Sequence, residues 1–280
     1  MRSATTNPAL VARVRHAEPV MGTVVSFDVP VTARYDGSLD AAVRWLHWVD
    51  RVFSPFRPDS DVSLLADAEV TVDGCAPEVA EVIEACAFVR ELSGGYFTAS
   101  PAGRFDPSGY VKGWAVERAA DILSAAGSVS HLVNGGGDVH CVGGRPVPSA
   151  AGAQAGGGTL AGGATASAPW RVGIADPHRP GRLALVVEAR DCGVATSGTA
   201  ERGTHIINPH AGRPAAGLAS LTVVGPSLAL ADACATAAFA MGPDLARAWA
   251  ESLPGYEAYA ITETGQTWQT AGFAAFIAAA

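Results

Sequence analysis

Residues 221–243 read LTVVGPSLALADACATAAFAMGP, a β-branched run that leads directly into a strongly apolar segment. The β-branched run predicts the end of a strand. Pro226 and Ser227 then open a helix over 228–241, and Gly242 with Pro243 stops it. Helices and strands are mixed along the rest of the chain without strict βαβ alternation, which predicts the α+β fold class rather than a doubly wound sheet.

Two polar residues interrupt the apolar helix over 228–241. Asp232 and Thr236 are four residues apart, so they share one face of the helix, one turn from each other. A carboxylate among Ala, Cys, Leu and Phe is costly unless it is paired or binds a cation, and hard oxygen ligands of this kind suit Mg²⁺. In the alternative, Asp232 is a cap or helix-dipole partner and Thr236 bonds back to a carbonyl. The spacing alone leaves both interpretations open.

Apolar periodicity and turn residues place the remaining elements. Helices are predicted over 38–53, with Ser38 as the N-cap, and over 77–92, 114–125 and 245–252. A strand is predicted over 20–29, and short β-like runs follow at 131–138, 170–177, 184–191, 193–198, 218–225 and 256–262.

The segment from about 148 to 169 is rich in Gly and Ala and holds no bulky side chain except Leu160. It has too little apolar area to offset the entropy of ordering it, so it predicts a flexible surface insertion. The whole chain, 1–280, is expected to form a single domain that carries this insertion.

Composition excludes several classes of protein. The formal net charge of −8, with no run of basic residues, argues against a nucleic-acid surface. No apolar stretch reaches membrane-spanning length, so no membrane insertion is expected. Five cysteines without CxxC spacing favour a reducing compartment and argue against zinc. The N-terminal residues lack a signal-peptide run and a lipobox, which predicts a cytoplasmic location.

The stretch FDPSGYVKGW, residues 105–114, contains Lys112, the only lysine among 19 basic residues. An ammonium is a compact point charge, whereas the guanidinium used elsewhere in this chain is a broad planar fork. Lys112 lies between glycines, just before the helical pattern over 114–125, where its side chain could face a ligand. The alternative is chance in an arginine-biased composition.

Two further stretches could carry chemistry. VNGGGD, 133–138, allows close approach of backbone to a ligand, but it lacks the P-loop and GxGxxG spacings and is also typical of a tight turn. His205, in TSGTAERGTHIINPHAGRP, is a candidate general base near neutral pH, with six other histidines competing for that role. Ser108 and Ser197 are not in a GxSxG context, so a serine hydrolase is disfavoured.

Eight stretches, in order along nearly the whole chain, resemble one family, the FAD:protein FMN transferases or ApbE-like flavin transferases. They are MGTVVSFDV at 21–29, FSPFRPDSDVSLL at 53–65, FDPSGYVKGWAVERAADIL at 105–123, LVNGGGD at 132–138, VGIADP at 172–177, ATSG at 195–198, HIINPHAGRP at 205–214 and ADACATAAF at 231–239. Each motif is weak alone, and their shared order makes the resemblance specific.

The resemblance implies a T-fold-like α+β architecture of mixed sheets packed with helices. It also implies binding of FAD and Mg²⁺, transfer of FMN from FAD to a threonine or serine hydroxyl of a target protein, and release of AMP. Some members hydrolyse FAD to FMN and AMP instead, so an FAD pyrophosphatase is one alternative. A non-catalytic FAD-binding protein is another.

The resemblance also implies site residues. His205 matches the residue that activates the acceptor hydroxyl, and the main-chain oxygen of Gly109 joins Asp232 and Thr236 as metal ligands. The implied flavin-site positions are Met21, Phe56, Tyr96, Phe97, Thr98, Asp106, Lys112 and Ile206. Four positions depart from the family's pattern: Phe56 replaces a frequent Tyr, Thr98 an acidic residue, and Asn208 and Ala211 an Asp and a Thr. We expect catalytic competence, while these departures leave target choice and rate open.

Overall fold

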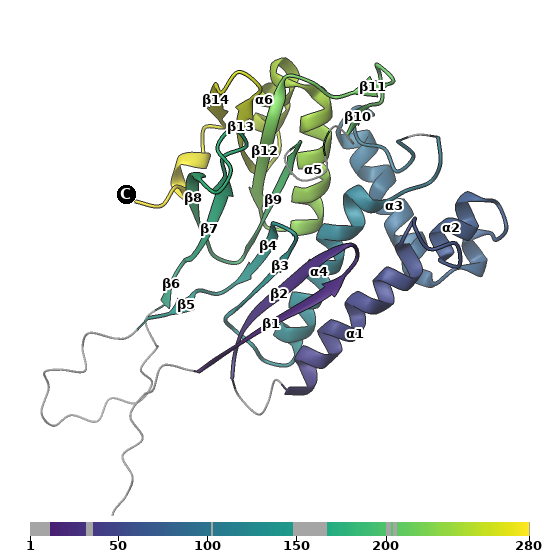
Figure 1. Cartoon of the computed structure of the whole chain (residues 1–280), viewed down its shortest axis with the longest axis horizontal. Helices are drawn as coiled ribbons and strands as arrows, with labels where there is room; N and C mark the ends of the chain where they lie inside the picture. The colour runs from purple at the N-terminus through teal and green to yellow at the C-terminus, as the bar shows by residue number, and fades with distance from the viewer. Residues whose placement is uncertain are drawn as a thin grey trace, which may run out of the picture.

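The computed structural model describes residues 12–31, 36–101, 103–147, 167–199, 203 and 206–279. Within these ranges an eight-stranded sheet forms the centre of the molecule (Figure 1). Its order is β1 (Arg13–Val20), β2 (Thr23–Pro30), β3 (His131–Gly135), β4 (Asp138–Val142), β9 (Cys192–Gly198), β12 (Leu218–Gly225), β13 (Glu257–Thr262) and β14 (Thr267–Gln269). Every neighbouring pair in it is antiparallel.

Three two-stranded ribbons and several helices complete the described fold. The ribbons pair β5 (Arg145–Pro146) with β6 (Ser167–Ala168), β7 (Trp170–Ala175) with β8 (Leu183–Ala189), and β10 (Ile207–Asn208) with β11 (Arg213–Pro214). The helices are α1 (Asp36–Phe53), α2 (Asp61–Ala66), α3 (Pro77–Leu92), α4 (Ser108–Ala125), α5 (Leu228–Met241), α6 (Pro243–Glu251) and the short 3₁₀ turns η1 (Val72–Gly74) and η3 (Phe273–Phe276). The α+β prediction is confirmed.

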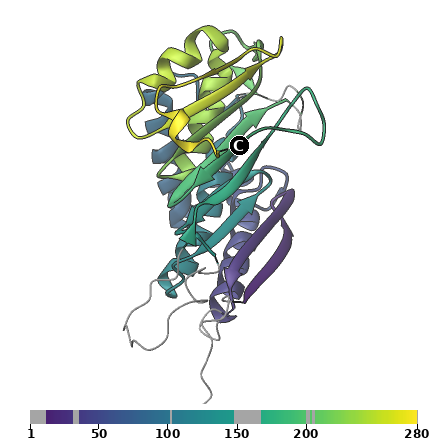
Figure 2. The same cartoon turned by 90° about the vertical axis from the view of Figure 1, so that its left-hand side faces the viewer.

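Helices α4 and α5 lie side by side on one face of the sheet, and α1 packs on α4 (Figures 1 and 2). Their shared core includes the fully buried Leu46, Leu123 and Leu228. Because α5 is enclosed by the sheet and α4, nearly all of its side chains are buried. Enclosure on all sides explains why its sequence lacks a polar face.

The opposite face of the sheet is covered by the β7–β8 ribbon and η3. Trp170, Val187 and Phe273 pack there against Cys141 and Val194 of the central strands. The central strand β12 is buried along its whole length, so apolar residues occupy both of its faces, and Ser220 and Thr222 are buried with them. In the part of the chain that is described, no helix has both the length and the apolar character needed to cross a membrane.

Several predicted boundaries are wrong. The strand predicted over 20–29 is the second strand of a hairpin, β1–β2, whose turn is Met21–Gly22. The helix α1 begins at Asp36, so Ser38 lies inside it and is not its N-cap. The helix predicted to begin at 114 begins at Ser108, which places Gly109 and Lys112 in its first turns. Of the predicted insertion, 148–166 lies outside the described residues, and Ser167 and Ala168 belong to β6.

Gly113 sets the distance between α4 and α5. A methyl group built on its Cα would lie 2.7 Å from the Leu228 carbonyl oxygen and 2.8 Å from Cβ of Asp232. We predict that Gly113→Ala lowers the free energy of unfolding by about 1–3 kcal/mol, because the two helices must move apart. Urea denaturation measures this loss. The control Gly74→Ala, whose added methyl would have only Val70 Cβ nearby, at 3.9 Å, should change stability little, and an equal loss in both variants would contradict the packing argument.

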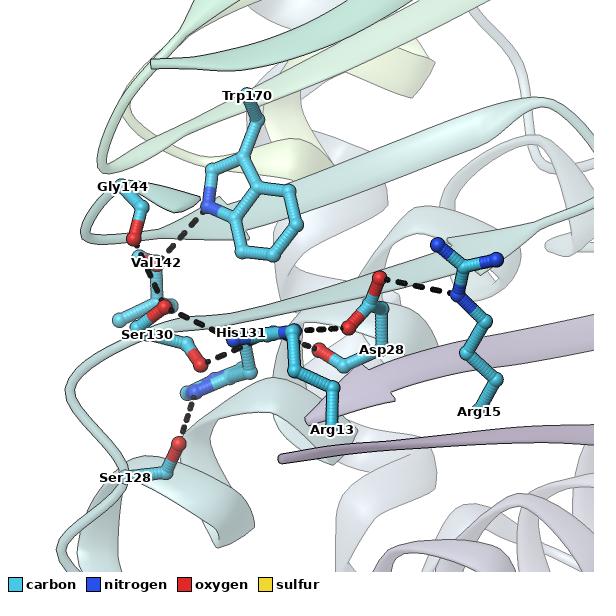
Figure 3. A network of polar contacts seen from close by, with 9 residues as sticks. All are labelled: Arg13, Arg15, Asp28, Ser128, Ser130, His131, Val142, Gly144 and Trp170. Carbon is cyan, nitrogen blue, oxygen red and sulfur yellow. Dashed lines mark hydrogen bonds and ion pairs between the residues drawn. The ribbon is translucent and has the colours of Figure 1, made fainter. Parts of the chain in front are cut away.

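A polar network fixes one end of the sheet, where β1, β2 and β3 approach the β7–β8 ribbon (Figure 3). Arg13 pairs with the Asp28 carboxylate, donates to the Asp28 carbonyl at 2.8 Å, and lies 4.9 Å from the centre of the Trp170 ring. Ser130 Oγ donates to the Gly144 carbonyl at 2.8 Å. The network joins the β1–β2 hairpin to the β7–β8 ribbon, which covers the face of the sheet opposite the helices.

The buried His131 lies beside this network (Figure 3). Its Nε2 donates to the Ala120 carbonyl at 3.0 Å and its Nδ1 accepts from Ser128 Oγ at 2.9 Å. Burial lowers the pKa of His131 from 6.5 to about 4, so the unfolded chain binds a proton here that the folded chain does not bind until lower pH.

We therefore predict that His131 makes the free energy of unfolding fall as the pH falls from 6.5 to about 4, by about 3 kcal/mol in total. Urea denaturation at a series of pH values measures this dependence. The variant His131→Gln keeps a polar side chain but cannot titrate, so its curve should be flatter over this window. Parallel curves for the two proteins would show that another group carries the dependence.

Candidate functional site

Lys112 extends from α4 between two buried carboxylates. Its Nζ forms an ion pair with Oδ2 of Asp138, the first residue of β4, and lies 3.6 Å from Oδ1 of Asp232 on α5. The side chain of Asp138 is 1% exposed and that of Asp232 is 4% exposed, whereas that of Lys112 is 24% exposed. Two buried carboxylates thus share this ammonium.

Backbone N–H groups hold both carboxylates in place. Asp232 Oδ2 accepts from the Gly113 amide at 3.0 Å, and Asp138 Oδ1 accepts from the Thr196 amide of β9 at 2.9 Å. Thr196 Oγ1 is in turn 2.8 Å from Thr222 Oγ1 on β12. The cluster is therefore held by two helices and the centre of the sheet.

The pKa of Asp232 is raised to about 7, mainly by burial and in smaller part by the nearby Asp138 charge. The Lys112 charge and the Gly113 amide act in the opposite direction but do not cancel the effect of burial. A carboxylate in this position is stabilised by an additional cation. The electrostatics of the cluster therefore suit a small, hard cation beside Asp232.

Hard oxygen atoms lie next to Asp232. Thr236 Oγ1 is one turn further along α5, 3.4 Å from Ser197 Oγ. A methyl group built on Gly109 would lie 3.8 Å from Thr236 Oγ1, so the side of Gly109 that carries no side chain faces the threonine. Gly109, Asp232 and Thr236, predicted as metal ligands, are thus brought together by α4 and α5.

This donor set fits Mg²⁺, which typically takes few protein ligands and fills its sphere with water and phosphate oxygens. Among the residues that the structure describes, no three His, Cys, Asp or Glu side chains are grouped to hold a metal ion. An ion bound beside Asp232 would therefore rely on the threonine hydroxyl, the glycine carbonyl and ligand oxygens.

The structure excludes the interpretation of Asp232 as a helix cap. The N-cap of α5 is Ser227, whose Oγ accepts from the Leu230 amide at 3.2 Å. Glu117 of α4 adds a second acceptor, since its Oε2 lies 2.8 Å from the Ala229 amide and 2.9 Å from Ser227 Oγ. The helix terminus is satisfied without Asp232, which leaves that carboxylate to the Lys112 cluster.

Several of the predicted flavin-site positions border the start of α4. Phe97 is buried, and one edge of its ring lies 3.3 Å from a methyl group built on Gly109. Asp106 Oδ1 accepts from the Ser108 amide at 3.0 Å, so it satisfies the first N–H group of α4. The Asp106 amide donates to the Ala99 carbonyl at 2.7 Å, which holds the segment containing Thr98 against this helix end.

Tyr96 connects this segment to the β10–β11 ribbon. Its ring meets the His210 ring edge to face at 4.4 Å between centroids, and His210 Nε2 is 3.0 Å from the Gly94 carbonyl oxygen. Asn208, which departs from the family's pattern, stabilises the turn between β10 and β11. Its Oδ1 accepts from the His210 amide at 3.0 Å and from the Ala211 amide at 3.1 Å.

The remaining predicted residues differ in how the structure places them. Met21 lies in the β1–β2 turn with a positive φ of 57°, and Thr23, which follows that turn, lies against Gly136 of the β3–β4 turn. Phe56 is 93% exposed in the α1–α2 turn. Ile206 is buried, and its carbonyl accepts from the Ala215 amide. His205 lies outside the described residues, so its role stays a prediction.

Sequence reasoning missed Asp138. The glycines before it form the tight β3–β4 turn, with positive φ at both Gly136 and Gly137. The available signal was the acidic residue immediately after that turn, at the start of a buried strand. Its partner Lys112 is distant in the sequence, and no local pattern joins them.

Comparisons with known proteins identify the family to which the chain belongs. The model of the ApbE family matches residues 21–103 and 98–260. A FAD:protein FMN transferase of Treponema pallidum (strain Nichols) is 34% identical over 168 residues, which cover 56% of this chain and 43% of that protein. One of Rhodobacter capsulatus is 32% identical over 155 residues, covering 52% and 26%. The matched part is thus less than half of the length of either relative.

Two solved structures share the fold. The ApbE protein of Thermotoga maritima gives a TM-score of 0.79 at 21% identity, covering 96% of this chain and 100% of that one. The flavin transferase ApbE of Vibrio cholerae gives 0.77 at 21% identity, covering 95% and 99%. At this identity the likeness establishes the architecture.

Proposed function

The chain belongs to the ApbE family, and from that premise we propose that it is a Mg²⁺-dependent FAD:protein FMN transferase. It would move FMN from FAD to a threonine or serine hydroxyl of a target protein and release AMP. The observation that carries the proposal is the cluster of Lys112, Asp138 and Asp232 beside Thr236 and Gly109. Curated relatives named FAD:protein FMN transferase support the same activity.

In the proposed reaction, the acceptor hydroxyl oxygen attacks the FMN phosphorus of FAD. A new P–O bond forms, the pyrophosphate P–O bond to AMP breaks, and AMP leaves with the electron pair of that bond. His205 would take the hydroxyl proton as general base. The product is FMN held to the target protein by a phosphoester.

The protein's own residues supply charge and position for this step. The Lys112 ammonium would meet the anionic pyrophosphate in a protein whose net charge is −8. Asp232, Thr236 and the Gly109 carbonyl would hold Mg²⁺, which supplies Lewis-acid polarisation of the phosphoryl oxygens when bound. Positioning and electrostatic stabilisation carry most of the catalysis in phosphoryl transfer, so a rigid buried cluster suits it.

Incubation with FAD and Mg²⁺, followed by chromatography, tests the proposal. With a peptide that carries a flavinylation motif, we expect AMP to appear as FAD is consumed, and the flavin to elute with the peptide. FMN plus AMP at the same rate with and without the peptide would identify an FAD pyrophosphatase instead. Unchanged FAD in both samples would leave only a non-catalytic FAD-binding protein.

A further inference from the structure

We propose that Asp138 is a positioning residue for Lys112, which it holds apart from Asp232 so that the charge of Asp232 stays available to a metal ion. This inference deepens the proposed function and rests on it. The inference is drawn from the position of the Lys112 ammonium, which lies between two buried carboxylates but closer to one of them. Lys112 Nζ is in direct contact with Asp138, whereas Asp232 Oδ1 is 3.6 Å away.

The two carboxylates are anchored differently. Asp138 belongs to the sheet: it opens β4, and its Oδ1 is fixed by the Thr196 amide of the adjacent β9. Asp232 belongs to α5, and its Oδ2 is fixed by the Gly113 amide of α4. The ammonium therefore lies nearer to the sheet carboxylate than to the helix carboxylate, and Asp232 shares its helix face with Thr236, one turn away.

The charges make this separation useful. A divalent cation beside Asp232 is repelled by an ammonium that pairs closely with the same carboxylate. The repulsion is much weaker when a second carboxylate neutralises that ammonium. Asp138 supplies that second carboxylate at 1% side-chain exposure, where electrostatic interactions are strong. The cluster can then hold two cations next to each other, the ammonium on Asp138 and the metal on Asp232.

The same argument accounts for lysine at position 112 in a chain whose other basic residues are arginines. A guanidinium presents five donors in a fixed fork and suits bidentate pairing with carboxylates. Between Asp138 and Asp232 it would bridge both and neutralise the metal-binding carboxylate. An ammonium is compact enough to stay with Asp138.

The only lysine of the chain also provides a selective probe. Lysine labelled with ¹³C at Cε gives a single side-chain signal, and its NMR relaxation reports how restrained the Lys112 side chain is. In the wild-type chain without FAD, we expect a restrained side chain both before and after Mg²⁺ is added, because Asp138 holds it in both states. A side chain released by Mg²⁺ would show that Asp232 was its anchor and would overturn the proposal.

Asp138→Asn is the matched variant, because its amide oxygen can still accept from Thr196 while the charge is lost. Its Lys112 should be restrained without Mg²⁺, by transfer to Asp232, and mobile once Mg²⁺ occupies Asp232. The Mg²⁺ concentration for half-maximal FAD turnover should rise about tenfold, because Lys112 then competes with Mg²⁺ for Asp232. Loss of a residue that orients a metal ligand has an effect of similar size. A side chain that stays restrained in Mg²⁺, or an unchanged Mg²⁺ requirement, would contradict the proposal.

These readouts separate the two proposals. If Asp138→Asn does not fold, the wild-type relaxation experiment still decides the positioning role. If the wild-type chain leaves FAD unchanged but Lys112 behaves as expected in both proteins, the proposed transfer fails, while the pairing of Lys112 with Asp138 and the metal site at Asp232 stand. If turnover is Mg²⁺-dependent but Lys112 is released by Mg²⁺, the positioning role fails alone.

Discussion

Asp232→Ala is expected to lower the Mg²⁺-dependent turnover of FAD by at least about a thousandfold, because a Lewis acid contributes several kcal/mol to the stabilisation of transition-state charge. The substitution removes the only carboxylate among the three proposed metal ligands. It also leaves the Gly113 amide without its acceptor, while Lys112 keeps its pair with Asp138. Initial rates of AMP release at saturating FAD, over a range of Mg²⁺ concentrations, measure the effect.

The control for Asp232→Ala is Asp121→Ala, which removes one carboxylate from the exposed side of α4. That variant should turn over FAD at the wild-type rate. Retained Mg²⁺-dependent activity in folded Asp232→Ala would mean that the metal binds elsewhere, and the proposed ligand set would be wrong.

Lys112→Met is expected to reduce turnover by at least about a hundredfold, in the range seen when a single preorganised electrostatic contact to the transition state is lost. Two effects contribute. The pyrophosphate loses an ammonium, and Asp138 and Asp232 are left as two buried carboxylates without their shared cation. FAD affinity should also fall, which fluorescence titration measures separately from the rate.

Arg118→Met is the matched control for Lys112→Met, because it removes one positive charge from the same helix. Arg118 forms an exposed pair with Glu81 at 3.0 Å, and such surface pairs are worth about 0–1 kcal/mol. Its activity and FAD affinity should stay close to wild type. Equal behaviour of the two variants would reduce Lys112 to an ordinary surface charge.

Local sequence signals were enough to predict the bounds of those helices whose ends carry a capping or helix-starting residue. The predicted bounds of α3 and α5 agree with the structure, because Pro77 opens the first and Ser227 caps the second. The four-residue spacing of Asp232 and Thr236 placed them correctly on one face of α5. The sheet strands with β-branched runs were also located, although their pairing was not predicted.

Elements decided by tertiary packing were not predictable in the same way. The first turns of α4 contain Gly109 and Gly113, which have poor helix propensity, and the helix is stabilised there by contact with α5. The strand β1, RVRHAEPV, alternates charged and apolar residues at the sheet edge and lacks the β-branched run of its partner β2. The pairing of Lys112 with Asp138 joins a helix to a strand. No local sequence pattern indicates it, so it could not be predicted.

The most direct measurement is covalent transfer of flavin to an acceptor peptide. The chain is incubated with FAD, Mg²⁺ and a peptide that carries a flavinylation motif, or with the same peptide in which the acceptor Thr is Ala, and the denatured products are examined by in-gel fluorescence. We expect a fluorescent band for the Thr peptide, with AMP released in equal amount, and no band for the Ala peptide or after chelation of Mg²⁺. A peptide that remains non-fluorescent while FAD persists, or while free FMN accumulates, would contradict the proposed function.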